Sequence, residues 1–219
     1  MTEVALQPWE VPEGEEEIIC ATLNHVGILT TQWDEMADWY RKVVGMRPNL
    51  VSEMPMPNGA GTVKMGFLSN DRANHRITLV TYPGLKDVGR QGYARSGQHV
   101  AFEYDSWDDL FATYKRLVRI GIPPVSCEAH GPSTNMYLLD PDKNVVELRV
   151  DNFGDWDKST DYFRRAENSQ DKNPRGAGCV DFDKMIAARE AGATPEDLCR
   201  RAMEGEFKPE VAPDMSFQL

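Results

Sequence analysis

Two histidines and one glutamate are the residues whose types and spacing point most directly to chemistry. His25 and His99 open short runs of apolar and β-branched residues, HVGILT and HVAFEY, and Glu147 lies within the apolar run VVELRV. An unpaired ionised carboxylate is very costly to bury, so Glu147 needs a cation nearby. Two imidazoles and one carboxylate are a ligand set that leaves adjacent positions of an octahedral metal open, and it suits Fe(II) or Mn(II). We therefore predict a metal centre at His25, His99 and Glu147.

A simpler interpretation stays open for each of these residues. Two histidines at matching positions of a duplicated strand are also explained as buried core residues. Glu147 is also explained by a structural ion pair with Arg149, which lies two residues along and on the same face of the predicted strand. The same ligand types also bind Zn or Ni. The metal centre is favoured because three suitable residues come together on predicted strands.

Three further ionisable residues are candidates for the same cleft. His75 precedes the apolar segment ITLVT, His130 lies in the turn-forming sequence HGPST, and Tyr137 lies in NMYLL. Taken singly, the two histidines are expected at the surface and the tyrosine in the core. Comparison of the last strands matches Glu147 with Leu79, so the first half is expected to lack the carboxylate. His75 shares the parity of Leu79 and is expected to point toward the metal.

An internal repeat explains why the candidate ligands come from equivalent elements. Residues 23–44 match residues 97–118 at a constant offset of 74, with a histidine at the same place in each copy. Each copy begins with a strand-like run and continues with apolar residues at helical spacing. The two helices are expected to end near Gly45 and Gly121. The chain therefore contains a duplicated module.

Three extended segments are expected after each helix, which makes each half βαβββ. They are predicted at about 47–53, 63–68 and 76–82, and at about 125–129, 135–139 and 145–150. The predicted fold class is α+β, with two tandem modules forming a curved, incompletely closed sheet around a metal cleft. The predicted divisions are an acidic arm (1–20), a two-module domain (21–151, with modules at about 21–83 and 95–151) and a C-terminal extension (152–219).

The C-terminal extension is predicted to be partly helical. A polar loop is expected directly after Asn152, followed by helices at about 181–190 and 195–203. Thr194 and Asp197 have the spacing of a capping box around a proline at the first helical position. The tail is expected to close the cleft or to form a subunit interface, and the chain is expected to be a homo-oligomer.

Composition excludes several classes of partner. The chain carries a formal net charge of −11 and has a pI near 4.9, so it is expected to repel nucleic acid and anionic membranes. No apolar run is long enough for a membrane span, and the acidic start lacks the pattern of a secretory signal. The four cysteines form no C-x-x-C pair and are read as reduced thiols. A cytoplasmic protein is expected.

The ordered motifs resemble the vicinal oxygen chelate superfamily. Within it, they are most similar to the type I extradiol (meta-cleaving) catechol dioxygenases of the short single-domain type. The resemblance covers about residues 22–155 and rests on LNHVGI, GQHVAF, DSWDDL and the set H-G-x5-Y-x2-DP-x2-N-x2-E. A lone histidine-valine pair is a weak signal, whereas the complete ordered set is specific.

The resemblance implies a function and a role for each candidate. It implies that the three predicted ligands hold Fe(II), and that His75 is the acid/base near the dioxygen site. His130 and Tyr137 are then expected to hydrogen-bond the substrate hydroxyl and the ring-opening intermediate. The implied reaction cleaves a catecholic substrate, such as catechol or 2,3-dihydroxybiphenyl, and inserts both atoms of O2.

Other functions share the same architecture. A glyoxalase-like metal-dependent isomerase or transferase is expected to have a more saturated metal site, against which the match of Leu79 to Glu147 argues. A non-catalytic small-molecule-binding module typically lacks the metal ligands. An interaction protein is supported by the acidic composition alone.

Overall fold

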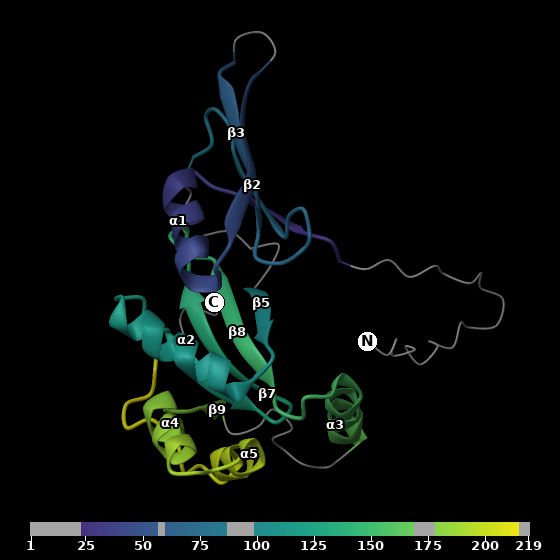
Figure 1. Cartoon of the computed structure of the whole chain (residues 1–219), viewed down its shortest axis with the longest axis vertical. Helices are drawn as coiled ribbons and strands as arrows, with labels where there is room; N and C mark the ends of the chain where they lie inside the picture. Colours follow the sequence, from purple (N-terminus) through teal and green to yellow (C-terminus); the bar gives the residue numbers. More distant parts are fainter. Residues whose placement is uncertain (1–22, 57–59, 87–98, 169–177, 215–219) are drawn as a thin grey trace, which may run out of the picture.

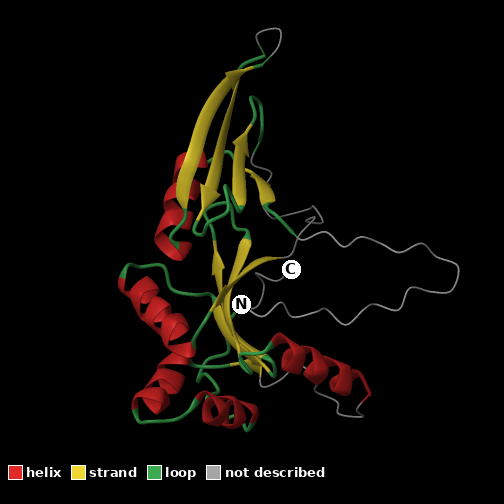
Figure 2. Cartoon of the chain, turned by 45° about the vertical axis from the view of Figure 1, so that its right-hand side comes forward, coloured by secondary structure: helices red, strands yellow, loops and turns green. Residues whose placement is uncertain are grey.

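The computed structural model describes residues 23–56, 60–86, 99–168 and 178–214, with the backbone alone for 163–168. These residues form two mixed sheets and five helices, in which the strands of the two modules follow one another along the long axis (Figures 1 and 2). The α+β class and the two βαβββ modules are thereby confirmed. Among the described residues, no strand of one module pairs with a strand of the other, so the strands form two separate sheets.

The first module has one helix and a four-stranded sheet. Its elements are β1 (Val26–Leu29), α1 (Trp33–Val44), β2 (Arg47–Pro55), β3 (Thr62–Ser69) and β4 (Ile77–Thr81). The strand order is β1-β4-β3-β2, with β1 and β4 parallel and the other two pairs antiparallel. The predicted segments of this half match the observed strands to within two residues at either end.

The second module repeats this order and adds a strand. Its elements are β5 (His99–Tyr104), α2 (Trp107–Arg119), β6 (Ser126–His130), β7 (Ser133–Leu139) and β8 (Val145–Asp151). A short strand from the C-terminal extension, β9 (Gly178–Cys179), pairs with β6, so the sheet order is β5-β8-β7-β6-β9. The sequence interpretation did not predict this fifth strand.

The helices form because their apolar residues recur at helical spacing, and the Ser106 side chain caps the start of α2. Met36 and Tyr40 of α1, and Leu110 and Leu117 of α2, are completely buried. α1 ends at Gly45, whose φ of 71° lies in the left-handed region that favours glycine. Each helix thus covers one face of its own sheet and leaves the opposite face for other contacts.

The strand register corrects one expectation about the first module. In the second module Glu147 lies opposite Ala101, and the residue 74 positions before Ala101 is Gly27, which lies opposite Thr78. Thr78 is therefore the counterpart of Glu147, and the expected match with Leu79 is wrong. Leu79 is completely buried in the core beneath α1. Thr78 does not carry a carboxylate either, so the first copy still lacks a counterpart of the Glu147 carboxylate.

The C-terminal extension contains α3 (Trp156–Asn168), α4 (Phe182–Glu190) and α5 (Pro195–Met203). The last two confirm the predicted helices, and Thr194 and Asp197 form the predicted capping box. α3 contradicts the predicted polar loop. The carboxylate of Asp155 accepts hydrogen bonds from the backbone N–H groups of Asp157 and Lys158 at 3.0 and 3.3 Å, a cap that stabilises the start of this helix.

Two helices of the extension pack against the second module. The Phe182 ring lies 5.4 Å from both Phe111 and Tyr114 of α2, measured between ring centroids. The guanidinium of Arg189 donates two hydrogen bonds of 2.9 Å to the carboxylate of Asp108, at the start of α2. In Figure 1, α4 and α5 lie at the same end of the molecule as α2. This part of the extension therefore completes the core of the second module.

Polar contacts join the two modules. The Tyr40 hydroxyl donates to Asp140 Oδ2 at 3.3 Å, and the Arg116 guanidinium donates to the carbonyl oxygen of Val43 at 3.0 Å. Gln32 Nε2 donates to Asp142 Oδ1 at 2.7 Å. These contacts connect α1 with α2 and with the turn between β7 and β8. Within the described ranges, no helix is long and apolar enough to cross a membrane.

Candidate metal centre

The second sheet has one apolar and one polar face. Val146, Leu148 and Val150 of β8 lie in the core beneath α2, and the residues that alternate with them point the other way. The strand register places ionisable or polar side chains from four strands on that second side, which we call the polar face: His99, Glu103, Glu128, His130, Asn135, Tyr137, Glu147 and Arg149. The candidate functional side chains of this module therefore lie on one face of the sheet.

His99 and Glu147 are in direct contact on the polar face. His99 Nε2 lies 3.0 Å from Glu147 Oε2, and the glutamate side chain is only 7% exposed. Arg149, the alternative partner of Glu147, instead has its Nε 3.3 Å from Glu103 Oε2. The structure thus does not show a Glu147–Arg149 pair, and the buried carboxylate contacts the predicted ligand His99 instead.

Tyr137 completes this cluster. Its hydroxyl donates to Glu147 Oε1 at 3.4 Å, and its ring stands edge-on to His99. Burial raises the pKa of Tyr137, and the neighbouring carboxylates of Glu147 and Glu128 raise it further. The phenol therefore remains protonated at neutral pH and can act as a hydrogen-bond donor.

His25 and His75 form a second cluster on the first sheet. Their ring centroids are 4.2 Å apart, and the His75 ring stacks on Phe67 at 4.4 Å. His25 Nδ1 lies 2.9 Å from Asn24 Oδ1, while His75 Nδ1 is buried and has no hydrogen-bond partner among the residues that the structure describes. His25 and His99 are both exposed, which contradicts the alternative that they are buried core histidines. His75 was expected to point toward the metal because it shares a strand face with Leu79, and Leu79 is not the counterpart of Glu147. The contact of His75 with His25 nevertheless places His75 beside a predicted ligand.

The structure brings together two of the three predicted metal ligands. His99 and Glu147 touch, and His25 directly precedes β1 of the other sheet. No group of three or more His, Cys, Asp or Glu residues close enough to hold a metal ion occurs among the residues that the structure describes. The role of His25 as third ligand therefore stays a prediction.

Glu128 was missed by the sequence interpretation. Its Oε2 lies 3.0 Å from His130 Nε2, and its side chain is 7% exposed. The alternation in SCEAH carries the signal, because residues two apart on a strand point to the same side. His130 thus also has a carboxylate partner on the polar face.

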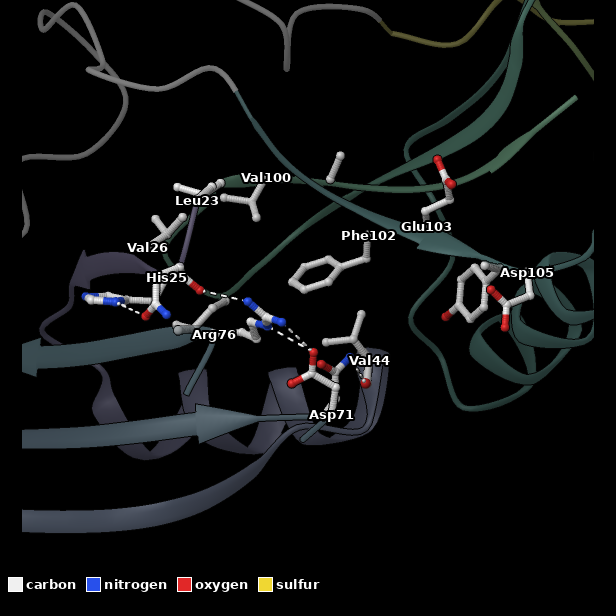
Figure 3. Close-up of a pocket in the computed structure, with 15 residues that line it drawn as sticks. Leu23, His25, Val26, Val44, Asp71, Arg76, Val100, Phe102, Glu103 and Asp105 are labelled. Atoms are coloured by element: carbon white, nitrogen blue, oxygen red, sulfur yellow. Dashed lines mark hydrogen bonds and ion pairs between the residues drawn. The ribbon is translucent and has the colours of Figure 1, made fainter. Parts of the chain in front are cut away.

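A cavity of about 580 Å³ lies where the edges of the two sheets approach one another. Residues of β1 and β4 line one side and residues of β5 the other, with His25 and Phe102 among them. Arg76 donates hydrogen bonds to the carbonyl oxygen of Asn24 and to the carboxylate of Asp71. In Figure 3, Phe102 projects from β5 toward Arg76. Of the predicted ligands in the described part of the chain, His25 alone lines this cavity.

The donor chemistry on the polar face fits a divalent metal. An imidazole nitrogen and a carboxylate oxygen, here 3.0 Å apart, are the donor types of an octahedral Fe(II) or Mn(II) site. The buried carboxylate is an anion whose desolvation a bound cation would offset. Thiolate is not part of this set: burial raises the pKa of Cys127 well above its ordinary value.

The fold, the repeat and the face carrying these residues define a family. The model of the glyoxalase/bleomycin resistance protein/dioxygenase superfamily matches residues 22–148. The chain belongs to this superfamily, which is the vicinal oxygen chelate superfamily of the sequence interpretation, and the predicted resemblance is confirmed.

Two curated relatives come from Rhodococcus globerulus. The chain is 32% identical over 192 residues to biphenyl-2,3-diol 1,2-dioxygenase 2, covering 87% of this chain and 91% of that protein. It is 35% identical over 185 residues to biphenyl-2,3-diol 1,2-dioxygenase 3, covering 82% and 88%. A solved glyoxylase/bleomycin resistance protein/dioxygenase domain from Frankia sp. EAN1pec aligns at 18% identity with a TM-score of 0.47, covering 61% of this chain and 93% of that one.

Proposed function

We propose that this protein is an Fe(II)-dependent extradiol dioxygenase that opens the ring of a vicinal aromatic diol and inserts both atoms of O2. The observation that carries the proposal is the contact between His99 and the buried Glu147, with Tyr137 donating to the same carboxylate. It occurs in a chain whose two relatives are named as biphenyl-2,3-diol dioxygenases and align over most of its length.

The proposed metal ligands are His25, His99 and Glu147, with Mn(II) as the alternative metal. When bound, the metal supplies adjacent positions for the diol and dioxygen and a path for electrons between them. His25 belongs to this set because it occupies the place of His99 in the first copy of the repeat. The protein fixes the orientation of the two reactants, which replaces a bimolecular encounter by a positioned one.

The remaining residues of the two clusters handle protons and hold the ring. Tyr137 keeps its proton, and when substrate is bound its single O–H turns from Glu147 to donate to a substrate oxygen that develops negative charge. His130 holds the substrate hydroxyl from the neighbouring strand. His75 accepts the second proton of the diol at a ring nitrogen and returns it later, since imidazole exchanges a proton near neutral pH.

The substrate is proposed to be a catechol or a biaryl diol such as 2,3-dihydroxybiphenyl. The names of the two relatives support the biaryl compound. The predicted domain divisions, the cytoplasmic location and the homo-oligomeric state stay predictions beside this proposal.

The test is to load the protein anaerobically with Fe(II) or, separately, Mn(II), and then to add each diol in air. Dioxygen uptake and visible absorbance are followed together. We expect a yellow semialdehyde product, one O2 consumed per diol and no reaction by His99→Ala. If iron binds and neither diol consumes dioxygen, the proposed substrate class is wrong. If no metal binds, the catalytic proposal fails and a binding module of the same fold takes its place.

A further inference from the structure

Glu128 is a buried carboxylate that the proposed reaction does not use. Its side chain is 7% exposed, and both of its oxygens have partners on the same strand. Oε2 lies 3.0 Å from His130 Nε2, and the Ser126 hydroxyl donates to Oε1 at 3.2 Å. These contacts offset part of the cost of burying the charge.

The burial of Glu128 depends on the C-terminal extension. Without β9, β6 would be the edge strand of the second sheet. With β9 present, Cys179 lies opposite Glu128 and Gly178 lies opposite Ala129. The backbone N–H of Val180 also donates to the carbonyl oxygen of Cys127 at 2.8 Å. The extension thus turns β6 into an interior strand, and Glu128 lies between β7 and β9.

The polar face therefore carries two imidazole–carboxylate pairs with the same contact distance, one formed across two strands and one within β6. In His99–Glu147 and in His130–Glu128, Nε2 and Oε2 are 3.0 Å apart. In both pairs the histidine side chain is about a third exposed and the glutamate is 7% exposed. Glu147 belongs to the proposed ligand set. Glu128 does not, so its contact with His130 requires a different explanation.

We propose that Glu128 is a positioning residue for His130. The carboxylate accepts a hydrogen bond from the Nε2–H group, which fixes both the orientation of the ring and the nitrogen that carries the proton. A histidine held in this way presents one defined tautomer to its second partner, and carboxylate partners of functional histidines commonly act in this way. This inference rests on the proposed function, because the contact between His130 and substrate belongs to that proposal. The C-terminal extension contributes indirectly, through the burial of Glu128 by β9.

The test compares Glu128→Gln with Glu190→Gln in the full-length Fe(II)-loaded enzyme. Gln preserves the shape of the side chain and removes its charge. Glu190 pairs with Lys115 at the surface, on the far end of α4, and serves as the matched control. We expect Glu128→Gln to lower kcat about 10- to 100-fold, with KM and iron content within about twofold of the wild-type values. Glu190→Gln is expected to match the wild type.

A second readout follows the His130 ring in the metal-free protein. With ¹⁵N-labelled histidine, the His130 signals are assigned by their loss in His130→Gln. We expect Glu128→Gln to shift the Nε2 resonance of His130 and to leave that of His99 unchanged. We also expect the double variant Glu128→Gln/His130→Gln to be no slower than His130→Gln alone, because the carboxylate acts through the imidazole.

Three results would overturn the proposal. These are a Glu128→Gln enzyme with wild-type kcat, a His130 spectrum unaffected by the substitution, or effects of the two substitutions that multiply. A wild-type protein that cleaves no diol would refute the proposed function separately. The histidine spectrum then still decides whether Glu128 holds the His130 ring, and an unchanged spectrum refutes the positioning.

Discussion

Where the second module pairs Glu147 with Ala101 across β8 and β5, the first module pairs Thr78 with Gly27 across β4 and β1. The same comparison on the next strand matches Tyr137, opposite Glu147, with Phe67, opposite Thr78. Two residues further along β8 and β4, at the next position on the same face, the polar pair Asn135 and Arg149 corresponds to the apolar pair Met65 and Val80 in the first module.

The opposite faces of the two sheets have not diverged in this way. Ile77 and Leu79 of β4 are buried beneath α1, as Val146 and Leu148 of β8 are buried beneath α2. A face that packs against a helix must stay apolar, because a buried polar group without a partner is costly. The other face was free to change. The comparison teaches that the ionisable chemistry is concentrated in one copy, and that the first copy adds a histidine pair and apolar surface.

The largest effect is expected when the carboxylate of the second module is removed. Glu147→Ala should lower kcat/KM about 1,000-fold or more, since a bound metal contributes several kcal/mol and about 1.4 kcal/mol corresponds to a factor of ten. The counterpart Thr78→Val should stay within about threefold of the wild type. Dioxygen uptake and iron content measure both. Equal losses in the two variants would mean that the modules are functionally equivalent.

The next effect tests whether the extension belongs to the second module. Phe182 is 2% exposed and packs on two aromatic rings of α2, so Phe182→Ala should lower the free energy of unfolding by about 3–5 kcal/mol. Met203, at the end of α5, is 46% exposed, and Met203→Ala should change it by less than about 0.5 kcal/mol. Urea unfolding followed by fluorescence gives both values. A small effect of Phe182→Ala would show that the extension folds separately.

The smallest effect concerns the tyrosine that has a phenylalanine as its counterpart. Tyr137→Phe should lower kcat about 10- to 100-fold, the range expected for one lost hydrogen bond to a charged group. Adding Phe67→Tyr to this variant should not restore activity, because Phe67 stacks on His75 and does not face Glu147. Steady-state kinetics with the better diol measures both variants. Restored activity in the double variant would show that the first module can supply the same hydroxyl.

Much of the fold could be predicted from the sequence because the signals are local. The repeat with offset 74 gave the two modules, and the spacing of apolar residues located α1 and α2. The capping box at Thr194 located the start of α5. Two elements escaped prediction. The start of α3 depends on capping by Asp155 within a polar segment, and β9 is a two-residue strand formed only by pairing with β6.

The sequence by itself determined the residue types of the candidate site and placed His99 and Glu147 on one face. Only the tertiary structure decided the register of β4, because the two threonines of ITLVT, Thr78 and Thr81, lie on opposite faces of the strand and the segment shows no regular alternation. A slip of one residue exchanges the two faces of a strand, which is why Thr78 and not Leu79 is the counterpart of Glu147. The pairing of Glu128 with His130 and the separation of His25 from His99 likewise depend on contacts between strands and between modules, which no local pattern records.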